Sequence, residues 1–158
     1  MSTRTNPSYV KFTVRGENAN VTISVKWREF PDLHDYHDGN WLISDITIMV
    51  PGFKGSFDFC LDAPALAGFL QELNQMKATV SGSASFTPIE PSISLVGEMT
   101  NMRQIRWKGI AQYPLGYGSE LDFEFESDQS YLPEVISELE NVLSLFPVRR
   151  QAGESNRS

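Results

Sequence analysis

Residues 121–143 read LDFEFESDQSYLPEVISELENVL, and this stretch decides the fold. Leu121, Phe123 and Phe125 alternate with three carboxylates, so residues 121–126 are predicted to form a strand with one apolar and one solvated face. Apolar residues then recur at helical spacing, which predicts an amphipathic helix over 131–145 with Ser130 as its cap. The apolar positions of this helix are Leu132, Val135, Ile136, Leu139, Val142, Leu143 and Phe146. The strand face and the helix stripe must bury each other.

The same order of strand and helix occurs once before in the chain. Residues 53–61 predict a strand, and Asp62 can then accept a hydrogen bond from the first turn of a helix that tolerates Pro64. This helix should run to Thr79, with an apolar stripe made of Leu66, Phe69, Leu70, Leu73 and Met76. Gly68 costs about 1 kcal/mol relative to Ala inside a helix, which suggests that the helix approaches a sheet closely there.

Further segments alternate polar and apolar residues between turn formers, at 9–15, 21–28, 41–50, 80–87, 93–99 and 104–113. In the second of these, alternation places the side chains of Val21, Ile23, Val25 and Trp27 on the inner face. The sequence therefore predicts an α+β fold, mostly antiparallel, with about eight strands and two amphipathic helices.

Four strands and a helix occur twice, which predicts half-repeats at 9–80 and 81–147 in a pseudo-twofold (ββββα)2 arrangement. A shift of 66 positions aligns Trp41 with Trp107. The other matching pairs are Gly52/Gly118, Phe57/Phe123, Phe59/Phe125, Asp62/Asp128, Leu66/Leu132, Glu72/Glu138 and Leu73/Leu139. The alternative is that any aromatic strand followed by an amphipathic helix would align in part.

The 158 residues have room for one domain, which we place at 9–147 between a flexible N-terminus (1–8) and a disordered tail (148–158). One cysteine excludes a disulfide framework. The sequence lacks a secretion signal and an apolar membrane span, so we expect a cytoplasmic protein without membrane contact. No nucleotide-binding, P-loop, triad or metalloprotease motif occurs, so we expect neither an enzyme nor a cofactor.

Both histidines, His34 and His37, lie in a loop with three carboxylates. Imidazole and carboxylate bind zinc, manganese or iron, so the loop is a weak candidate for a metal or small-molecule site in a cleft between the half-units. The alternative is a solvated loop in which Asp and Gly serve the turns. Cys60 has no evident base to activate it, so we expect it to be a small buried residue rather than a nucleophile.

The distribution of charge is uneven. Residues 109–148 contain no Lys or Arg but eight of the carboxylates, whereas the whole chain has a net charge of −7. The candidate partner-binding residues are Glu120, Asp122, Glu124, Glu126 and Asp128. Concentrated negative charge speeds the encounter with a basic protein and repels nucleic acid. The alternative is that an acidic surface serves only solubility.

A smaller basic group consists of Lys26, Arg28, Arg103, Arg106 and Lys108. We expect these cations to pair with the acidic strand of the same molecule, an effect worth little at the surface.

The acidic strand and the run Asp128-Gln129-Ser130-Tyr131-Leu132 before a helix resemble the WapI-type immunity proteins of bacterial polymorphic-toxin systems. Residues 57–73 fit the same pattern, and the order of elements agrees over 9–146. The resemblance implies a cytoplasmic protein that binds and neutralises a toxin without catalysis of its own. The acidic strand adds the hypothesis that this toxin is basic, such as a nuclease-type toxin. The resemblance implies no particular site residues. A homodimer formed through an exposed sheet edge stays open.

Overall fold

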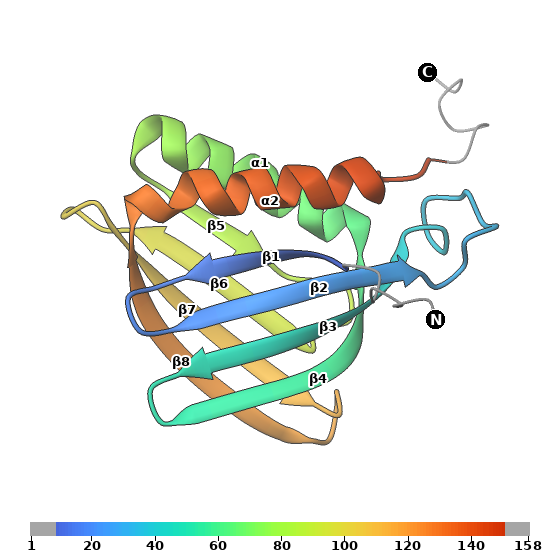
Figure 1. Cartoon of the computed structure of the whole chain (residues 1–158), viewed down its shortest axis with the longest axis horizontal. Helices are drawn as coiled ribbons and strands as arrows, with labels where there is room; N and C mark the ends of the chain where they lie inside the picture. The colour runs from blue at the N-terminus through green and yellow to red at the C-terminus, as the bar shows by residue number, and fades with distance from the viewer. Residues whose placement is uncertain (1–8, 151–158) are drawn as a thin grey trace, which may run out of the picture.

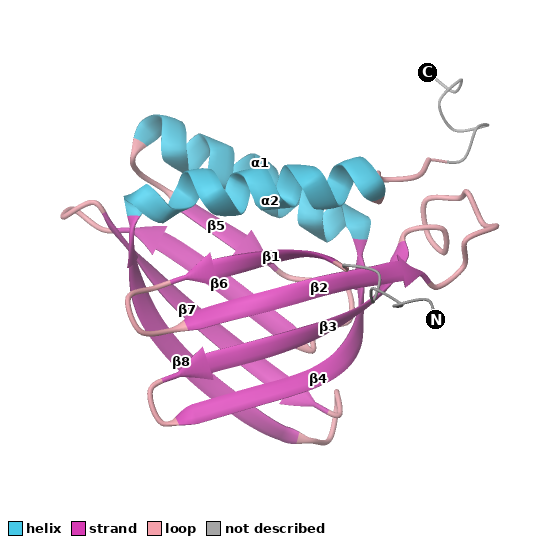
Figure 2. Ribbon diagram, in the orientation of Figure 1, coloured by secondary structure: helices cyan, strands magenta, loops and turns pink. Residues whose placement is uncertain are grey.

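A computed structural model describes residues 9–150 and contains two four-stranded antiparallel sheets and two helices (Figures 1 and 2). The first sheet has the order β1 (Val10–Arg15), β2 (Asn20–Arg28), β3 (Trp41–Val50) and β4 (Phe53–Asp62). After α1 (Ala63–Thr79) follows the second sheet, β5 (Ser83–Phe86), β6 (Ile93–Met99), β7 (Gln104–Tyr113) and β8 (Ser119–Asp128). The chain continues through a 3₁₀ turn, η1 (Gln129–Tyr131), into α2 (Leu132–Leu145). The predicted α+β fold of eight strands and two helices is confirmed.

The sheets face each other, and the two helices lie side by side along one end of the molecule (Figure 1). Helix α2 packs on β1, and α1 packs on β5. The inner sheet faces and the helix stripes share one cluster of buried apolar side chains, of which Phe12, Phe69, Phe86 and Trp107 are among the largest. The helices therefore occupy an end of the sandwich and leave the outer faces of both sheets uncovered (Figure 2).

A glutamate of each helix accepts a hydrogen bond from a backbone N–H of the adjacent edge strand. Glu138 of α2 accepts a hydrogen bond from the Thr13 N–H of β1, and Glu72 of α1 accepts one from the Ser85 N–H of β5, each at 3.0 Å. Arg15 donates to both oxygens of Glu138 at 3.0 Å, and this carboxylate raises the pKa of Arg15. Edge N–H groups that a further strand would otherwise have to satisfy thus find acceptors within the chain.

Two inward-facing glycines of the second sheet make room for aromatic rings of the next strand. A Cβ atom on Gly97 would lie 2.5 Å from the Trp107 ring, and one on Gly109 would collide with the Phe123 ring. Both rings are buried. The missing side chains leave the space that each ring occupies next to the neighbouring strand.

The predicted inward orientation of Trp27 is wrong. The register of β2 with β3 shifts between Val25 and Trp27, so that Trp27 lies opposite Ile43. This β-bulge at Lys26 turns the Trp27 side chain outward, where it is 52% exposed, and turns Arg28 inward, where it is 9% exposed. An inserted residue shifts the two-residue alternation by one position, and composition alone does not reveal it.

Both helix starts use an aspartate. Asp62 accepts from the Ala65 N–H (3.1 Å), which confirms it as the cap of α1. At the second helix the prediction of Ser130 as the cap is wrong: Asp128 accepts from the Ser130 N–H (3.1 Å) and caps η1 instead. The extra 3₁₀ turn lets the carboxylate at the end of β8 take the role that Asp62 has at the end of β4.

The other end of α1 also differs from expectation. Val80 ends the helix in the left-handed conformation (φ 50°) with its N–H bonded to the Met76 carbonyl, so β5 begins at Ser83 and not at Val80. A Cβ atom on Gly68 would meet nothing within 4 Å, so the predicted close approach at this glycine is wrong.

The segment after α2 is tied to the loop between β2 and β3. The Arg149 N–H donates to Asn40 Oδ1 (2.7 Å), and Asn40 Nδ2 donates back to the Arg149 carbonyl (3.0 Å). Arg28 donates to the carbonyls of Gly39 (2.8 Å) and Pro147 (2.5 Å). Of the tail expected to be disordered, residues 148–150 thus lie in the described part of the chain, whereas 151–158 and the N-terminal 1–8 lie outside it.

The half-repeat stays a proposal. The β3–β4 and β7–β8 hairpins show which elements the shift of 66 positions can align. Trp41 lies opposite Asp62, but Gln104 lies opposite Asp128. The β3–β4 turn is residues 51–52 and the β7–β8 loop is residues 114–118, so the shift of 66 positions fits β4, β8 and the helices but not β3 and β7. Trp41 and Trp107 therefore occupy different places in their hairpins.

We expect Gly97→Ala to lower the free energy of unfolding by about 1–3 kcal/mol, because the added methyl group overlaps a buried ring that has no space to move. Gly68→Ala, the matched control, should raise it by up to about 1 kcal/mol, because the site is open and Ala favours a helix. Urea denaturation measures both. A stable Gly97→Ala protein would contradict the packing described here.

Candidate partner-binding face

Four carboxylates of β8 point outward along one strand. Glu120, Asp122, Glu124 and Glu126 are exposed, and the residues between them face the core. Alternate residues of a strand are about 7 Å apart, so the four side chains form a continuous row. We call these four residues the acidic face. Because neither helix lies over this side of the second sheet, the acidic face is open to a partner (Figure 1).

The acidic face is only partly neutralised by its neighbours. Rows of outward side chains run across β6, β7 and β8: Glu98–Arg106–Glu126, Val96–Lys108–Glu124 and Ser94–Ile110–Asp122. Arg106 Nη2 lies 3.5 Å from Glu126 Oε1, in an ion pair whose side chains are both more than half exposed. Such a pair contributes little stability but cancels charge locally. Part of the expected intramolecular pairing is therefore present.

The surplus of negative charge lies at the other end of the row. Asp122 is opposite Ile110 on β7, and Glu120 is opposite Gln112. Neither carboxylate has a cation as its direct cross-strand neighbour. This end of β8 adjoins the β7–β8 loop.

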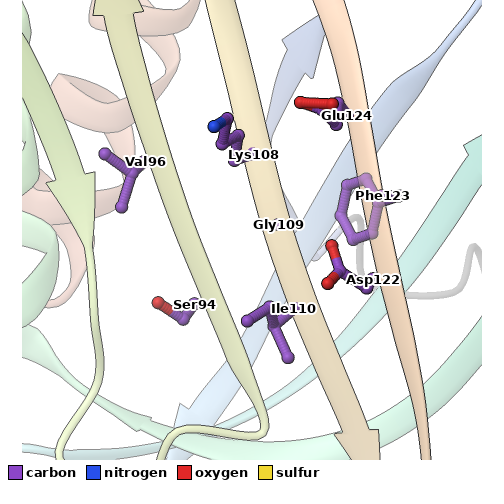
Figure 3. Close-up of a pocket in the computed structure, with 8 residues that line it drawn as sticks. All are labelled: Ser94, Val96, Lys108, Gly109, Ile110, Asp122, Phe123 and Glu124. Atoms are coloured by element: carbon purple, nitrogen blue, oxygen red, sulfur yellow. The ribbon is translucent and has the colours of Figure 1, made fainter.

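A shallow hollow of about 730 Å³ lies on the same side of the second sheet. It is lined by Ser94, Val96, Lys108, Gly109, Ile110, Asp122, Phe123 and Glu124. Figure 3 shows Lys108 and Glu124 toward one end of the hollow, and Ser94, Ile110 and Asp122 toward the other. The hollow thus reaches from the row in which Lys108 lies opposite Glu124 to the row in which Ile110 lies opposite Asp122.

Asp128 differs from the acidic face, although the sequence placed it in the same group. Its carboxylate accepts from the Ser130 N–H (3.1 Å) and from Gln104 Nε2 (2.9 Å). The hydrogen bonds from Ser130, and then that from Gln104, lower the pKa of Asp128. The side chain is therefore occupied in holding the end of β8 and the start of η1.

The loop that carries His34 and His37 is organised by backbone contacts. Asp35 accepts from the Asp38 N–H (2.8 Å), which lowers the pKa of Asp35. His37 lines a hollow of about 500 Å³ beside the start of α1, but His34 does not line it. Within residues 9–150, no three His, Cys, Asp or Glu side chains are grouped so as to hold a metal ion.

The basic residues of the first sheet do not reach the acidic face. Lys26 lies 3.4 Å from Asp45 and 3.3 Å from Asp58, on the outer side of the first sheet. Arg28 is buried among backbone carbonyls, and burial together with the nearby charge of Arg149 lowers its pKa. Pairing of these two cations with β8 is therefore a wrong expectation.

Cys60 lies on the outer side of β4 and is half-buried rather than buried. Burial and the nearby Glu29 carboxylate raise its pKa to about 11. The thiol is thus protonated at neutral pH, which disfavours it as a nucleophile.

The comparison with known families decides the identity. The model of the WapI-like immunity protein family matches residues 12–147. The chain belongs to the WapI-like immunity protein family. The resemblance inferred from the strand and helix at 121–143 is thereby confirmed. No curated protein matches this immunity-family chain.

Two solved structures are similar to this member of the WapI-like family. MRP1/MRP2 of Trypanosoma brucei is 12% identical with a TM-score of 0.48, covering 88% of this chain and 85% of that chain. A CdiA-CT/CdiI toxin and immunity complex from Enterobacter cloacae is 10% identical with a TM-score of 0.42, covering 84% of this chain and 99% of that chain. Neither likeness is close enough to bear on function. No helix of this family member within residues 9–150 is long and apolar enough to cross a membrane.

Asp128→Ala should lower the melting temperature at neutral pH, because it removes the acceptor for Ser130 and Gln104. The pKa of Asp128 is lowered in the folded protein, so its contribution is present above the unfolded pKa of about 4. It is lost as the pH falls through the lowered folded value. Melting curves of variant and wild type should therefore converge in acid.

Asp122→Ala is the control, since Asp122 is an exposed carboxylate of the acidic face. Its melting temperature should match that of the wild type at every pH. Equal losses in both variants would show that Asp128 has no special structural role.

Proposed function

We propose that this chain is a cytoplasmic immunity protein that binds and neutralises a toxin, without catalysis of its own. Membership of the WapI-like family supports this proposal. The observation that carries the choice of surface is the pair Glu120 and Asp122, which lies on an open sheet face with no cation as a direct cross-strand neighbour. The toxin would cover this face and so be kept from its target.

The chemistry of the acidic face suggests a basic partner, such as a nuclease-type toxin. A toxin that cleaves nucleic acid needs a positive surface to bind phosphates, and a negative protein surface competes for the same cations. Nucleic acid itself is not a suitable ligand, because the acidic face would repel phosphates. Opposite charge also speeds encounter, which suits a protein that must capture a toxin before it acts.

Rescue of growth tests the proposed function. The toxin domain encoded by the adjoining gene is induced in cells with and without this chain. We expect growth to be restored when the chain is present and a stable complex to be isolated from those cells. No rescue together with no complex would refute the proposal.

Charge reversal tests the surface. We expect Glu120→Lys/Asp122→Lys to slow association with the purified toxin domain by about tenfold or more at low salt, with the difference shrinking as salt is added. Glu124→Lys/Glu126→Lys should slow it less, because Lys108 lies opposite Glu124 and Arg106 already pairs with Glu126. Stopped-flow fluorescence at several salt concentrations measures these rates.

The control Glu90→Lys/Glu140→Lys carries the same change of net charge on the β5–β6 loop and on α2. It should slow association only slightly. If it slows association as much as Glu120→Lys/Asp122→Lys, the effect belongs to the whole molecule and not to the acidic face.

A further inference from the structure

The outer side of the second sheet has an apolar centre that charge patterning alone does not predict. Ile110 is 46% exposed and Val96 is 39% exposed. Both line the hollow of Figure 3, on neighbouring strands. Along β7 the other outward positions, Arg106, Lys108 and Gln112, are polar or charged. The exposed apolar surface of Ile110 does not stabilise the free protein, and its burial by a partner would be favourable.

Charge is arranged asymmetrically around this centre. Lys108 precedes Ile110 in the outward series of β7 and lies opposite Glu124. Asp122 lies opposite Ile110 on β8. Because Ile110 has no charge, Asp122 has no cation as its direct cross-strand neighbour. A partner group at Ile110 therefore meets a cation next to it along β7 and, across the sheet, a carboxylate without a cation as its direct cross-strand neighbour.

We infer that Ile110 and Val96 form the anchoring centre of the toxin contact, and that Asp122 and Glu120 select a toxin surface with a Lys or Arg beside an apolar side chain. This inference rests on the proposed function and adds the chemistry of the partner. The apolar side chain of the toxin fills the hollow, and its neighbouring cation lies over Asp122. Lys108 disfavours a second cation at the other end of the hollow.

The division of roles follows from interface energetics. A few centrally placed side chains carry most of the affinity of a protein contact, and the polar rim mainly sets the association rate. Ile110 is the apolar member of this group, with Asp122 opposite it on β8, Ser94 opposite it on β6 and Lys108 next to it along β7. Losing its side chain should therefore shorten the lifetime of the complex, whereas losing a rim charge should change how fast the complex forms.

The outer side of the first sheet offers a matched comparison. Trp27 is an exposed apolar side chain there, packed edge-on against Tyr9 with ring centroids 6.2 Å apart. The nearby Asp45 and Asp58 share Lys26 at 3.4 and 3.3 Å. Trp27 thus has greater apolar area than Ile110 but lacks an unneutralised aspartate as its cross-strand partner, since Ile43 lies opposite.

The test measures association and dissociation rates between the purified toxin domain encoded by the adjoining gene and four variants of the full chain. Ile110→Ser should speed dissociation about tenfold or more with little change in association. Asp122→Asn should slow association at low salt. Lys108→Gln should speed association, because it removes the cation that opposes a basic partner. Trp27→Ser should change neither rate, and melting curves check that all four variants fold.

The outcomes separate this inference from the proposed function. A wild-type chain that neither binds nor protects against the toxin domain overturns both. If the wild type protects, but Ile110→Ser leaves dissociation unchanged or Trp27→Ser speeds it, the anchoring centre is not on the second sheet and only the inference fails. A slower association of Lys108→Gln would show that an anionic group of the toxin faces this position, which overturns the inferred partner chemistry. Self-association of the chain that is lost in Ile110→Ser, with toxin binding retained, would assign the centre to a second copy and also overturn it.

Discussion

The hydrogen bonds from Thr13 of β1 to Glu138 and from Ser85 of β5 to Glu72 are the interaction on which the placement of the helices depends. Each meander has two edge strands with N–H groups that need acceptors, and a helix supplies a carboxylate to one such N–H on β1 and on β5. The helices do this from the end of the sandwich, because the two edge strands that they contact, β1 and β5, lie there (Figure 1). Both outer sheet faces are consequently left without a helical layer. The openness of the acidic face is thus a product of how the edges are satisfied, and not a separate feature of β8.

The same constraint bears on the proposed half-repeat. Glu72 and Glu138 are 66 positions apart, as are the capping residues Asp62 and Asp128, and the members of each pair act in the same way on the two halves. The longer β7–β8 loop breaks this spacing in the preceding strand, which is why the tryptophans align in sequence but not in space. A duplication would account for the shared devices and tolerate a difference in a loop, because loops accept insertions at small cost. The proposed half-repeat is therefore supported more by the matching structural roles of Asp62/Asp128 and Glu72/Glu138 than by the matching tryptophans.

Periodicity predicted the number and type of elements because alternation and helical spacing each report burial directly. It failed where one residue changes the phase: the bulge at Lys26 moved Trp27 outward and Arg28 inward, and no local composition marks it. The carboxylates of β8 were found from sequence, since strand geometry alone puts them on one side. The cations opposite them were not predicted, because the position of Lys108 and Arg106 opposite Glu124 and Glu126 depends on the register between strands. For the same reason the apolar centre at Ile110 was invisible until β6, β7 and β8 were placed side by side.

The position of Glu120 and Asp122 on β8 explains why they can lack cationic cross-strand neighbours at small cost. Carboxylates about 7 Å apart repel one another, and the repulsion costs most where low-dielectric protein surrounds them and least where water screens them. Lys108 and Arg106 lie across from Glu124 and Glu126, in the middle and toward the helix-proximal end of β8. Glu120 and Asp122 lie toward the β7–β8 loop and are exposed, so water screens their repulsion. The fold can therefore keep charge unneutralised at the end of the strand at small cost to its stability. A basic partner that removes this water would find the attraction strengthened, because the same charges interact more strongly once they are covered.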